Sequence, residues 1–217
     1  MKTRKKKPRQ KKKTPVYVDM DGVLTDFCGD ALQCCSDAGL HSHVVQLAAH
    51  GWPADEYSLA GALGIGEYTL ADCINRVPTF WSRLTALPSL TWLLKEYLWV
   101  RTDIELYILS SPGSYPDSAT GKLFWVKASI GDAVPVLLVP SNCKKLLAKP
   151  GSILIDDSDT NVEDWQAAGG TGVLFPQLWN TKRLIALAEP QAVKDSVIGA
   201  LNEILGPPPD GCYRLRS

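Results

Sequence analysis

The chain of 217 residues contains no long uninterrupted apolar segment. Its longest apolar run, residues 134–139, is broken by Pro135 and is far shorter than the roughly 20 residues that a membrane-spanning helix needs. The N-terminus is charged, but no apolar stretch follows it, so we expect neither a membrane anchor nor export through a signal peptide. The expected location is therefore the cytoplasm.

The cysteines lack the paired spacing of a zinc site. Cys34 and Cys35 are adjacent, and neighbouring cysteines do not easily share one metal ion or an unstrained disulfide. We expect all six cysteines to be reduced thiols, namely Cys28, Cys34, Cys35, Cys73, Cys143 and Cys212.

The chain has no net charge, but this balance hides two opposite regions. Residues 1–13 hold nine Lys or Arg and no acid, whereas the rest of the chain has 14 basic and 23 acidic residues. We predict a disordered basic tail over residues 1–14. The tail is either a polyanion contact, with nuclear or nucleoid association, or only a solvated end, and the acidic body should repel polyanions.

Apolar segments typical of buried strands alternate with helical patterns along most of the chain. The expected strands cover residues 15–19, 104–109, 136–139, 152–155 and 172–175. The expected helices cover residues 87–98, 116–130, 142–147, 160–168 and 184–205. This alternation predicts an α/β, Rossmann-like fold, in which helices cover both faces of a parallel sheet and ligands bind beyond the carboxyl ends of its strands.

The segment between the first two strands does not fit the alternation. It has no convincing strand, contains several Gly and Pro residues, and is too long for a simple crossover. We therefore predict a core domain of residues 15–27 and 89–205, a small helical cap of residues 28–88 inserted after the first strand, and a flexible C-terminus of residues 206–217.

Pairs of aspartates follow two of the expected strands. Asp19 and Asp21 end the first strand, with Gly22 permitting a sharp turn, and Asp156 and Asp157 end the fourth. The carboxyl ends of parallel strands lie at one edge of a sheet, so these four carboxylates can converge. Like charges held this close favour a bound cation, and an all-oxygen ligand set suits Mg²⁺. The alternative is that each pair only forms a polar turn or a helix cap.

Hydroxyl and lysine side chains follow two other strands. Ser110 and Ser111 come after the second expected strand, where hydroxyls and backbone N–H groups can hold phosphate oxygens. Lys144 and Lys145 lie between the third and fourth strands, where one of them can offset the charge of a phosphate. The alternative for the lysines is two solvated residues on a short helix.

The order of these motifs resembles the four-motif signature of the haloacid dehalogenase (HAD) superfamily. DMDGVLTD, a hydroxyl, a lysine and an acidic pair follow one another across residues 16–175. The run DMDGVLTDF, the Phe80-Trp81 pair, the Ser-Ser-Pro turn and LIDDSDTNVEDWQAAGG are similar to the 5'(3')-deoxyribonucleotidases of this superfamily. Two departures are that Ser110-Ser111 stands where the family usually has Thr-Ser, and that the cap matches poorly.

The resemblance implies a phosphoryl-transfer enzyme with an aspartyl-phosphate intermediate. Asp19 would be the nucleophile, and Asp21 would act as general acid and then as general base. The Asp19 carboxylate, the Asp21 backbone carbonyl and Asp157 would hold Mg²⁺, with Asp156 in support. Ser110, Ser111 and Lys144 would bind the phosphate, and the choice of Lys144 over Lys145 rests on a loose alignment.

The implied substrate is a nucleoside (deoxy)ribonucleotide 5'-monophosphate. Phe27, Phe80 and Trp81 fall where family members stack a base, although all three can equally be cap core. Two other functions remain open at this point: a phosphatase for a small phosphosugar or a nucleic-acid terminal phosphate, and a nucleic-acid-binding protein that uses the domain as a scaffold. A homodimer is also left open.

Overall fold

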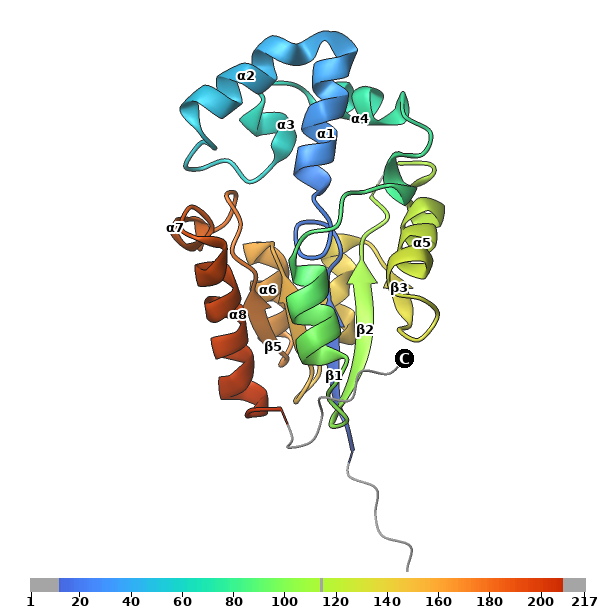
Figure 1. Ribbon diagram of the computed structural model, residues 1–217, viewed down its shortest axis with the longest axis vertical. Coiled ribbons are helices and arrows are strands. Elements are labelled where there is room, and N and C mark those ends of the chain that lie inside the picture. The colour runs from blue at the N-terminus through green and yellow to red at the C-terminus, as the bar shows by residue number, and fades with distance from the viewer. Residues whose placement is uncertain (1–11, 114, 209–217) are drawn as a thin grey trace, which may run out of the picture.

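A five-stranded sheet forms the centre of the computed structural model, which describes residues 12–113 and 115–208 (Figure 1). The strands are β1 (Thr14–Val18), β2 (Ile104–Ser110), β3 (Val136–Leu138), β4 (Ile153–Asp156) and β5 (Thr171–Leu174). Their order in the sheet is β3-β2-β1-β4-β5, and every pair is parallel. The predicted α/β fold class is confirmed.

Helices cover both faces of this sheet. One face packs against η3 (Leu90–Leu98), α5 (Ser118–Ser129) and α8 (Pro190–Leu205), and the other against η4 (Ser141–Leu147) and α6 (Asp159–Ala167). The alternation of β1 shows why both faces are apolar. Val16 and Val18 point to the first face, and Tyr17 points to the second, where it meets the buried Trp165 of α6.

The prediction of one continuous helix over residues 184–205 is wrong. The structure has a short α7 (Arg183–Ala186) and a separate α8 that begins at Pro190. Proline disfavours the helical conformation of the residue before it, and Glu189 is extended, with φ −74° and ψ 149°. Proline itself is well suited to the first turn of the new helix.

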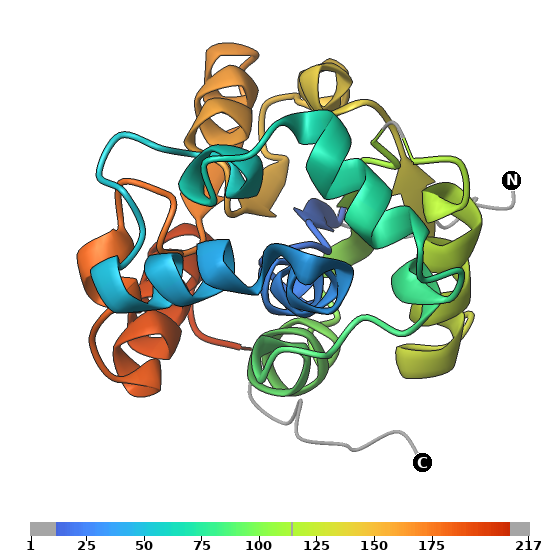
Figure 2. The same ribbon diagram turned by 90° about the horizontal axis from the view of Figure 1, so that it is seen from above.

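A helical cap lies above the carboxyl ends of the strands (Figures 1 and 2). It consists of α1 (Phe27–Cys35), η1 (Ser36–Leu40), α2 (His41–His50), α3 (Leu59–Ala62), α4 (Glu67–Asn75) and η2 (Phe80–Ser82). The chain enters and leaves the cap through adjacent segments, since Thr25 and Ala86 form an antiparallel bridge and the Asp26 N–H donates to the Thr85 carbonyl at 2.8 Å. The cap is therefore joined to the core by two paired connections.

Several sequence predictions concern the ends of the chain. Residues 1–11 of the predicted basic tail and residues 209–217 of the predicted flexible C-terminus, including Cys212, lie outside the described residues. Thr14, which we placed in the tail, already belongs to β1 and pairs with Ile104. In the part of the chain that the structure describes, five cysteines are free thiols, and no helix is both long and apolar enough to cross a membrane.

Candidate active site

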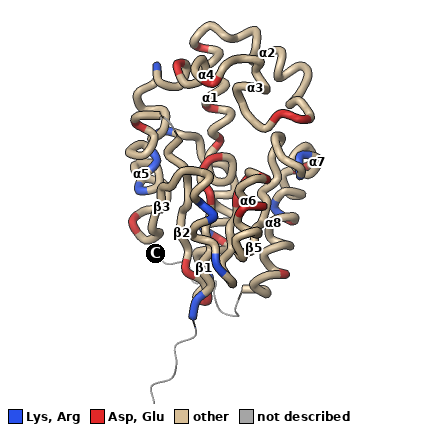
Figure 3. The backbone as a smooth tube through the Cα atoms, turned by 180° about the vertical axis from the view of Figure 1, so that it is seen from behind, with Lys and Arg blue, Asp and Glu red and all other residues tan. Residues whose placement is uncertain are grey.

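Asp19 lies at the centre of the sheet edge that faces the cap. It directly follows β1, which is flanked by β2 and β4, so the residues after all three strands meet there. Acidic and basic positions of the chain lie side by side in this region (Figure 3). The turn after Asp19 needs Gly22, whose φ of +73° suits glycine and whose added Cβ would lie 2.2 Å from an Asp157 carboxylate oxygen.

Three of the predicted carboxylates form a compact cluster. Oxygens of Asp19, Asp156 and Asp157 lie within 4.8 Å of one another. Burial raises the pKa of Asp19 to about 6, against the opposing effect of Lys144. Burial, together with the charges of Asp156 and Asp19, raises the pKa of Asp157 well above its usual range. Three carboxylates facing one lysine leave excess negative charge among oxygen donors, and this arrangement fits a divalent cation such as Mg²⁺.

Lys144 and Lys145 lie in different surroundings. The Lys144 Nζ is 3.0 Å from Asp19 and 2.7 Å from Asp156, and its side chain is only 2% exposed. Burial alone would lower the pKa of Lys144, but the two carboxylates outweigh it and raise that pKa. Lys145 instead pairs with the half-exposed Asp164 at 2.9 Å. The structure therefore brings Lys144, and not Lys145, to the acid cluster.

We expect Lys144→Met to lower the free energy of unfolding by about 3–5 kcal/mol, because it leaves buried carboxylates without their counter-charge. Lys145→Met is the matched control, and losing its exposed ion pair should change stability by less than about 1 kcal/mol. Urea denaturation of both variants without divalent cations measures this difference. Equal effects of the two substitutions would contradict the assigned role of Lys144.

Lys122 is a site residue that the sequence analysis missed. Its Nζ contacts an Asp21 carboxylate oxygen and the Ser111 carbonyl, and it donates to the Ser110 hydroxyl at 3.1 Å. Lys122 is 2% exposed although it lies on a helix. The sequence signal for Lys122 was its helical spacing from apolar and small residues. The buried residues of α5 follow this spacing and are Ser118, Gly121, Lys122, Trp125 and Val126.

The two serines after β2 differ in their surroundings. Ser110 is buried, with its hydroxyl next to Lys122. The Ser111 hydroxyl accepts a hydrogen bond from the Gly113 N–H at 3.2 Å, within the turn that follows. Ser110 is therefore the serine whose hydroxyl lies among the charged side chains.

Amide and indole groups that the sequence analysis did not single out hold the second acidic pair. Asp156 accepts hydrogen bonds from the Ser158 N–H and the Asn161 amide, each at 3.0 Å. The Trp179 indole N–H donates to an Asp157 carboxylate oxygen at 2.7 Å, and the Asn180 amide donates to the Asp157 carbonyl at 2.8 Å. Trp179 and Asn180 follow β5, where no acidic residue marks the sheet edge.

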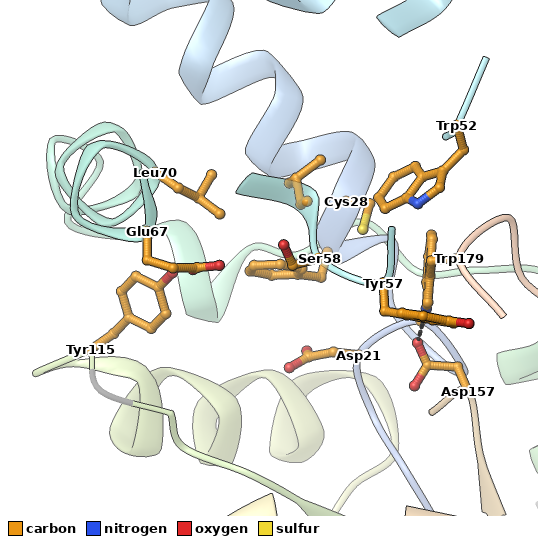
Figure 4. A pocket seen from close by; sticks show the side chains of 13 residues that line it. Asp21, Cys28, Trp52, Tyr57, Ser58, Glu67, Leu70, Tyr115, Asp157 and Trp179 are labelled. Carbon is orange, nitrogen blue, oxygen red and sulfur yellow. Dashed lines mark hydrogen bonds between the residues drawn. The ribbon is translucent and has the colours of Figure 1, made fainter. Parts of the chain in front are cut away.

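A pocket of about 260 Å³ lies between the cap and these carboxylates (Figure 4). Asp21 and Asp157 line it from the core side. Five aromatic side chains from cap and core also line it: Phe27, Trp52, Tyr57, Tyr115 and Trp179. The pocket thus combines acidic side chains with aromatic walls.

Phe80 and Trp81 do not line this pocket, contrary to the expectation that they serve as base platforms. They are 5% and 6% exposed, and Phe27 stacks on Trp81 with 5.5 Å between ring centroids. The reason is the packing of η2 on α5, which is so close that a Cβ added to Gly121 would lie 2.4 Å from the Trp81 Cβ. Of the three predicted aromatic residues, Phe27 reaches the pocket, whereas Phe80 and Trp81 are buried in the hydrophobic core.

Comparisons with known proteins give similarities at the level of the fold. No protein-family model and no curated protein matches the chain. Similar solved structures include a haloacid dehalogenase-like hydrolase from Streptococcus pneumoniae, with 13% identity over 85% of this chain and 90% of that one and a TM-score of 0.48. They also include the L-2-haloacid dehalogenase of Xanthobacter autotrophicus with covalently bound chloropropionic acid, with 17% identity, 85% and 87% coverage and a TM-score of 0.45.

A third similar structure is a HAD hydrolase from Bacillus subtilis bound to magnesium, with 12% identity over 76% of this chain and 87% of that one and a TM-score of 0.43. At such low identities and TM-scores these similarities concern the fold alone. None of the three is described as a nucleotidase, so that closer resemblance stays a prediction. The parallel sheet and the cap inserted after its first strand agree with the fold that the resemblance of the sequence motifs implies.

Proposed function

We propose that the protein is a Mg²⁺-dependent phosphomonoesterase that hydrolyses nucleoside 5'-monophosphates through an aspartyl-phosphate on Asp19. The observation that carries this proposal is the convergence of charged side chains at one sheet edge: buried Asp19, Lys122 and Lys144 lie beside Asp21 and the acidic cluster. Burying charges is unfavourable, and a nucleic-acid-binding scaffold has no need of such an arrangement.

Two contacts hold the carboxylate of Asp19, which supports its role as the nucleophile. One oxygen accepts the Met20 N–H at 2.8 Å, and the other lies 3.0 Å from the Lys144 Nζ. As the bond from Asp19 to phosphorus forms, the ester P–O bond breaks, and Asp21 protonates the departing alkoxide. Asp21 then takes a proton from the water that attacks phosphorus, which releases phosphate and restores Asp19.

Contacts other than those of Asp19 hold the Asp21 carboxylate in place for this proton transfer. The Thr25 hydroxyl donates to one carboxylate oxygen at 3.2 Å, and Lys122 contacts the other. Asp21 also lines the pocket, where a leaving group would lie. Lys122, Lys144 and the Ser110 hydroxyl together offer the positive charge and hydrogen bonds that a phosphate dianion needs.

The carboxylates of Asp19 and Asp157 and the backbone carbonyl of Asp21 would hold Mg²⁺, with Asp156 in support. When bound, the ion neutralises charge on the phosphate and on the nucleophile together. Asp156 is occupied by Lys144, Ser158 and Asn161, which suits a supporting role.

The walls of the pocket favour a leaving group that carries an aromatic ring and has no negative charge besides that of the reacting phosphate. Stacking of a base on an aromatic ring contributes about 1–3 kcal/mol. Besides the carboxylates of the core, the pocket is lined by Glu67, and its described lining residues include no Lys or Arg. A nucleic-acid strand would bring its next phosphate towards these acids, so a mononucleotide fits better than a strand with a terminal phosphate.

Phosphate release tests this function directly. Purified protein is assayed with and without Mg²⁺ on nucleoside monophosphates, sugar phosphates and 5'-phosphorylated oligonucleotides. We expect the highest kcat/KM on a mononucleotide and no turnover with EDTA. A preference for sugar phosphates would contradict the proposed nucleotide substrate. Chloride release from 2-chloropropionate without phosphatase activity would contradict the proposed phosphatase reaction.

Tyr57 offers a probe of base stacking that leaves the fold intact. It lines the pocket and is 64% exposed, so its truncation should cost little stability. We expect Tyr57→Ala to lower the ratio of kcat/KM for a nucleotide to kcat/KM for p-nitrophenyl phosphate by about 5- to 150-fold, the equivalent of one lost stack. Tyr68→Ala, at a 94% exposed cap tyrosine that does not line the pocket, is the matched control. An unchanged ratio for Tyr57→Ala would contradict stacking at this position.

A further inference from the structure

The Trp179 side chain contacts both the acidic cluster and the cap. Its indole N–H donates to an Asp157 carboxylate oxygen at 2.7 Å. Its ring packs against Trp52 of the cap, with 5.2 Å between ring centroids and 47° between ring planes. Figure 4 shows Trp179 standing between Asp157 and Trp52 at one side of the pocket.

The orientation of Asp157 depends on this hydrogen bond. Among the described residues, Trp179 is the one hydrogen-bond partner of the Asp157 carboxylate. Gly22 lies beside this hydrogen bond, so close that an added Cβ would lie 2.2 Å from the same Asp157 oxygen and 3.0 Å from the Trp179 ring. Fixing one carboxylate oxygen fixes the side-chain torsion angles, and with them the direction of the other oxygen.

The segment that carries Trp179 is itself anchored to the core. The Asn180 amide donates to the carbonyls of Asp157 and Phe175 at 2.8 and 2.7 Å, and the Gln177 amide contacts the Gly22 carbonyl. Trp179 is therefore a firmly placed donor rather than a residue of a loose surface loop.

The same segment makes a second link to the cap. The Arg183 guanidinium donates to the Ala54 carbonyl at 3.1 Å, two residues from Trp52 in the cap loop. Movement of this loop therefore changes the contacts of the element that orients Asp157.

We propose that Trp179 is a positioning residue that orients Asp157 for Mg²⁺ and couples Mg²⁺ affinity to the position of the cap. The proposal rests on the proposed function, because it assumes that Asp157 is a metal ligand. Groups that hydrogen-bond to a ligating carboxylate hold it in the binding geometry, and losing one typically weakens metal affinity by about 10- to 100-fold. Coupling of this kind is reciprocal, so Mg²⁺ would in turn favour the cap position in which Trp52 lies on Trp179.

The Mg²⁺ dissociation constant of the full chain, measured by titration calorimetry, tests the first half of the proposal. Trp179→Phe keeps an aromatic ring against Trp52 but removes the N–H, and we expect Mg²⁺ binding about 10- to 100-fold weaker than that of the unmodified protein. Trp179→His restores a ring N–H and should recover most of the affinity. Trp99→Phe, at an exposed tryptophan of the core, is the matched control and should bind as the unmodified protein does.

The second half is tested by Trp52→Leu, which removes the ring on the cap side and leaves the indole of Trp179 in place. We expect a several-fold loss of Mg²⁺ affinity, and no loss would overturn the coupling. Unchanged affinity in Trp179→Phe, or equal losses in Trp179→Phe and Trp179→His, would overturn the positioning role while the phosphatase proposal stands. Absence of Mg²⁺ binding by the unmodified protein would overturn both.

Discussion

Asp19→Asn should reduce phosphate release on the order of 10⁶-fold, the scale of loss seen when an enzyme loses its covalent nucleophile. An amide oxygen does not form the acyl-phosphate bond, whereas Ser110, Lys122 and Lys144 remain to bind substrate. The measurement is single-turnover phosphate release with Mg²⁺, with mass spectrometry to detect reversion by deamidation. Turnover by a folded and unreverted variant would contradict the covalent mechanism.

The same variant should not lose stability. The folded-state pKa of Asp19 is about 6, above the ordinary 3.8, so its ionised form is disfavoured in the fold. Stability therefore falls as pH rises from about 4 to about 6 and stays lower above that range. A neutral amide removes this effect at pH 7 and still offers an oxygen to Lys144. Urea denaturation at pH 7 without divalent cations should show a free energy of unfolding equal to or above that of the unmodified protein.

Asp21→Asn should lower kcat by about 10²- to 10⁴-fold, because general acid–base catalysis contributes on that scale. The amide oxygen can still accept from Lys122 and the amide NH2 can donate to the Thr25 hydroxyl, so the side chain stays in place while the transferable proton is lost. Stopped-flow and steady-state kinetics on one nucleotide give kcat for both proteins.

Mg²⁺ affinity of Asp21→Asn should stay unchanged, since the proposed metal contact of Asp21 is its backbone carbonyl. The Asp21 carboxylate lies against Lys122 and does not belong to the cluster of Asp19, Asp156 and Asp157. Asp26→Asn is the matched control: Asp26 caps α1 through the Gly29 N–H, and asparagine caps a helix equally well. Loss of Mg²⁺ binding in Asp21→Asn would show that the ligand atom is wrongly assigned.

Both acidic pairs were predictable because their position is a local property of the chain. A strand that ends in aspartates places them at its own carboxyl end, and parallel pairing brings such ends to one edge. The five strands and the inserted helical cap were predictable for a similar reason, since each strand is a short apolar run between breaks. Pro190 was also a local signal, and the expectation of one helix across it overlooked that signal.

The sequence alone therefore determined the fold class, the cap insertion and the placement of Asp19 and Asp157 at the strand ends. Only the tertiary structure decided which side chains surround them. Lys122 comes from one flank of the sheet and Trp179 from the other, and each acts through a partner more than 20 residues away in the chain. Phe80 and Trp81 are buried because η2 packs on α5, whereas Trp52 and Trp179 line the pocket because the cap loop meets the segment after β5. Such contacts depend on how separate elements pack, and the spacing of residues along one element carries no information about its partner.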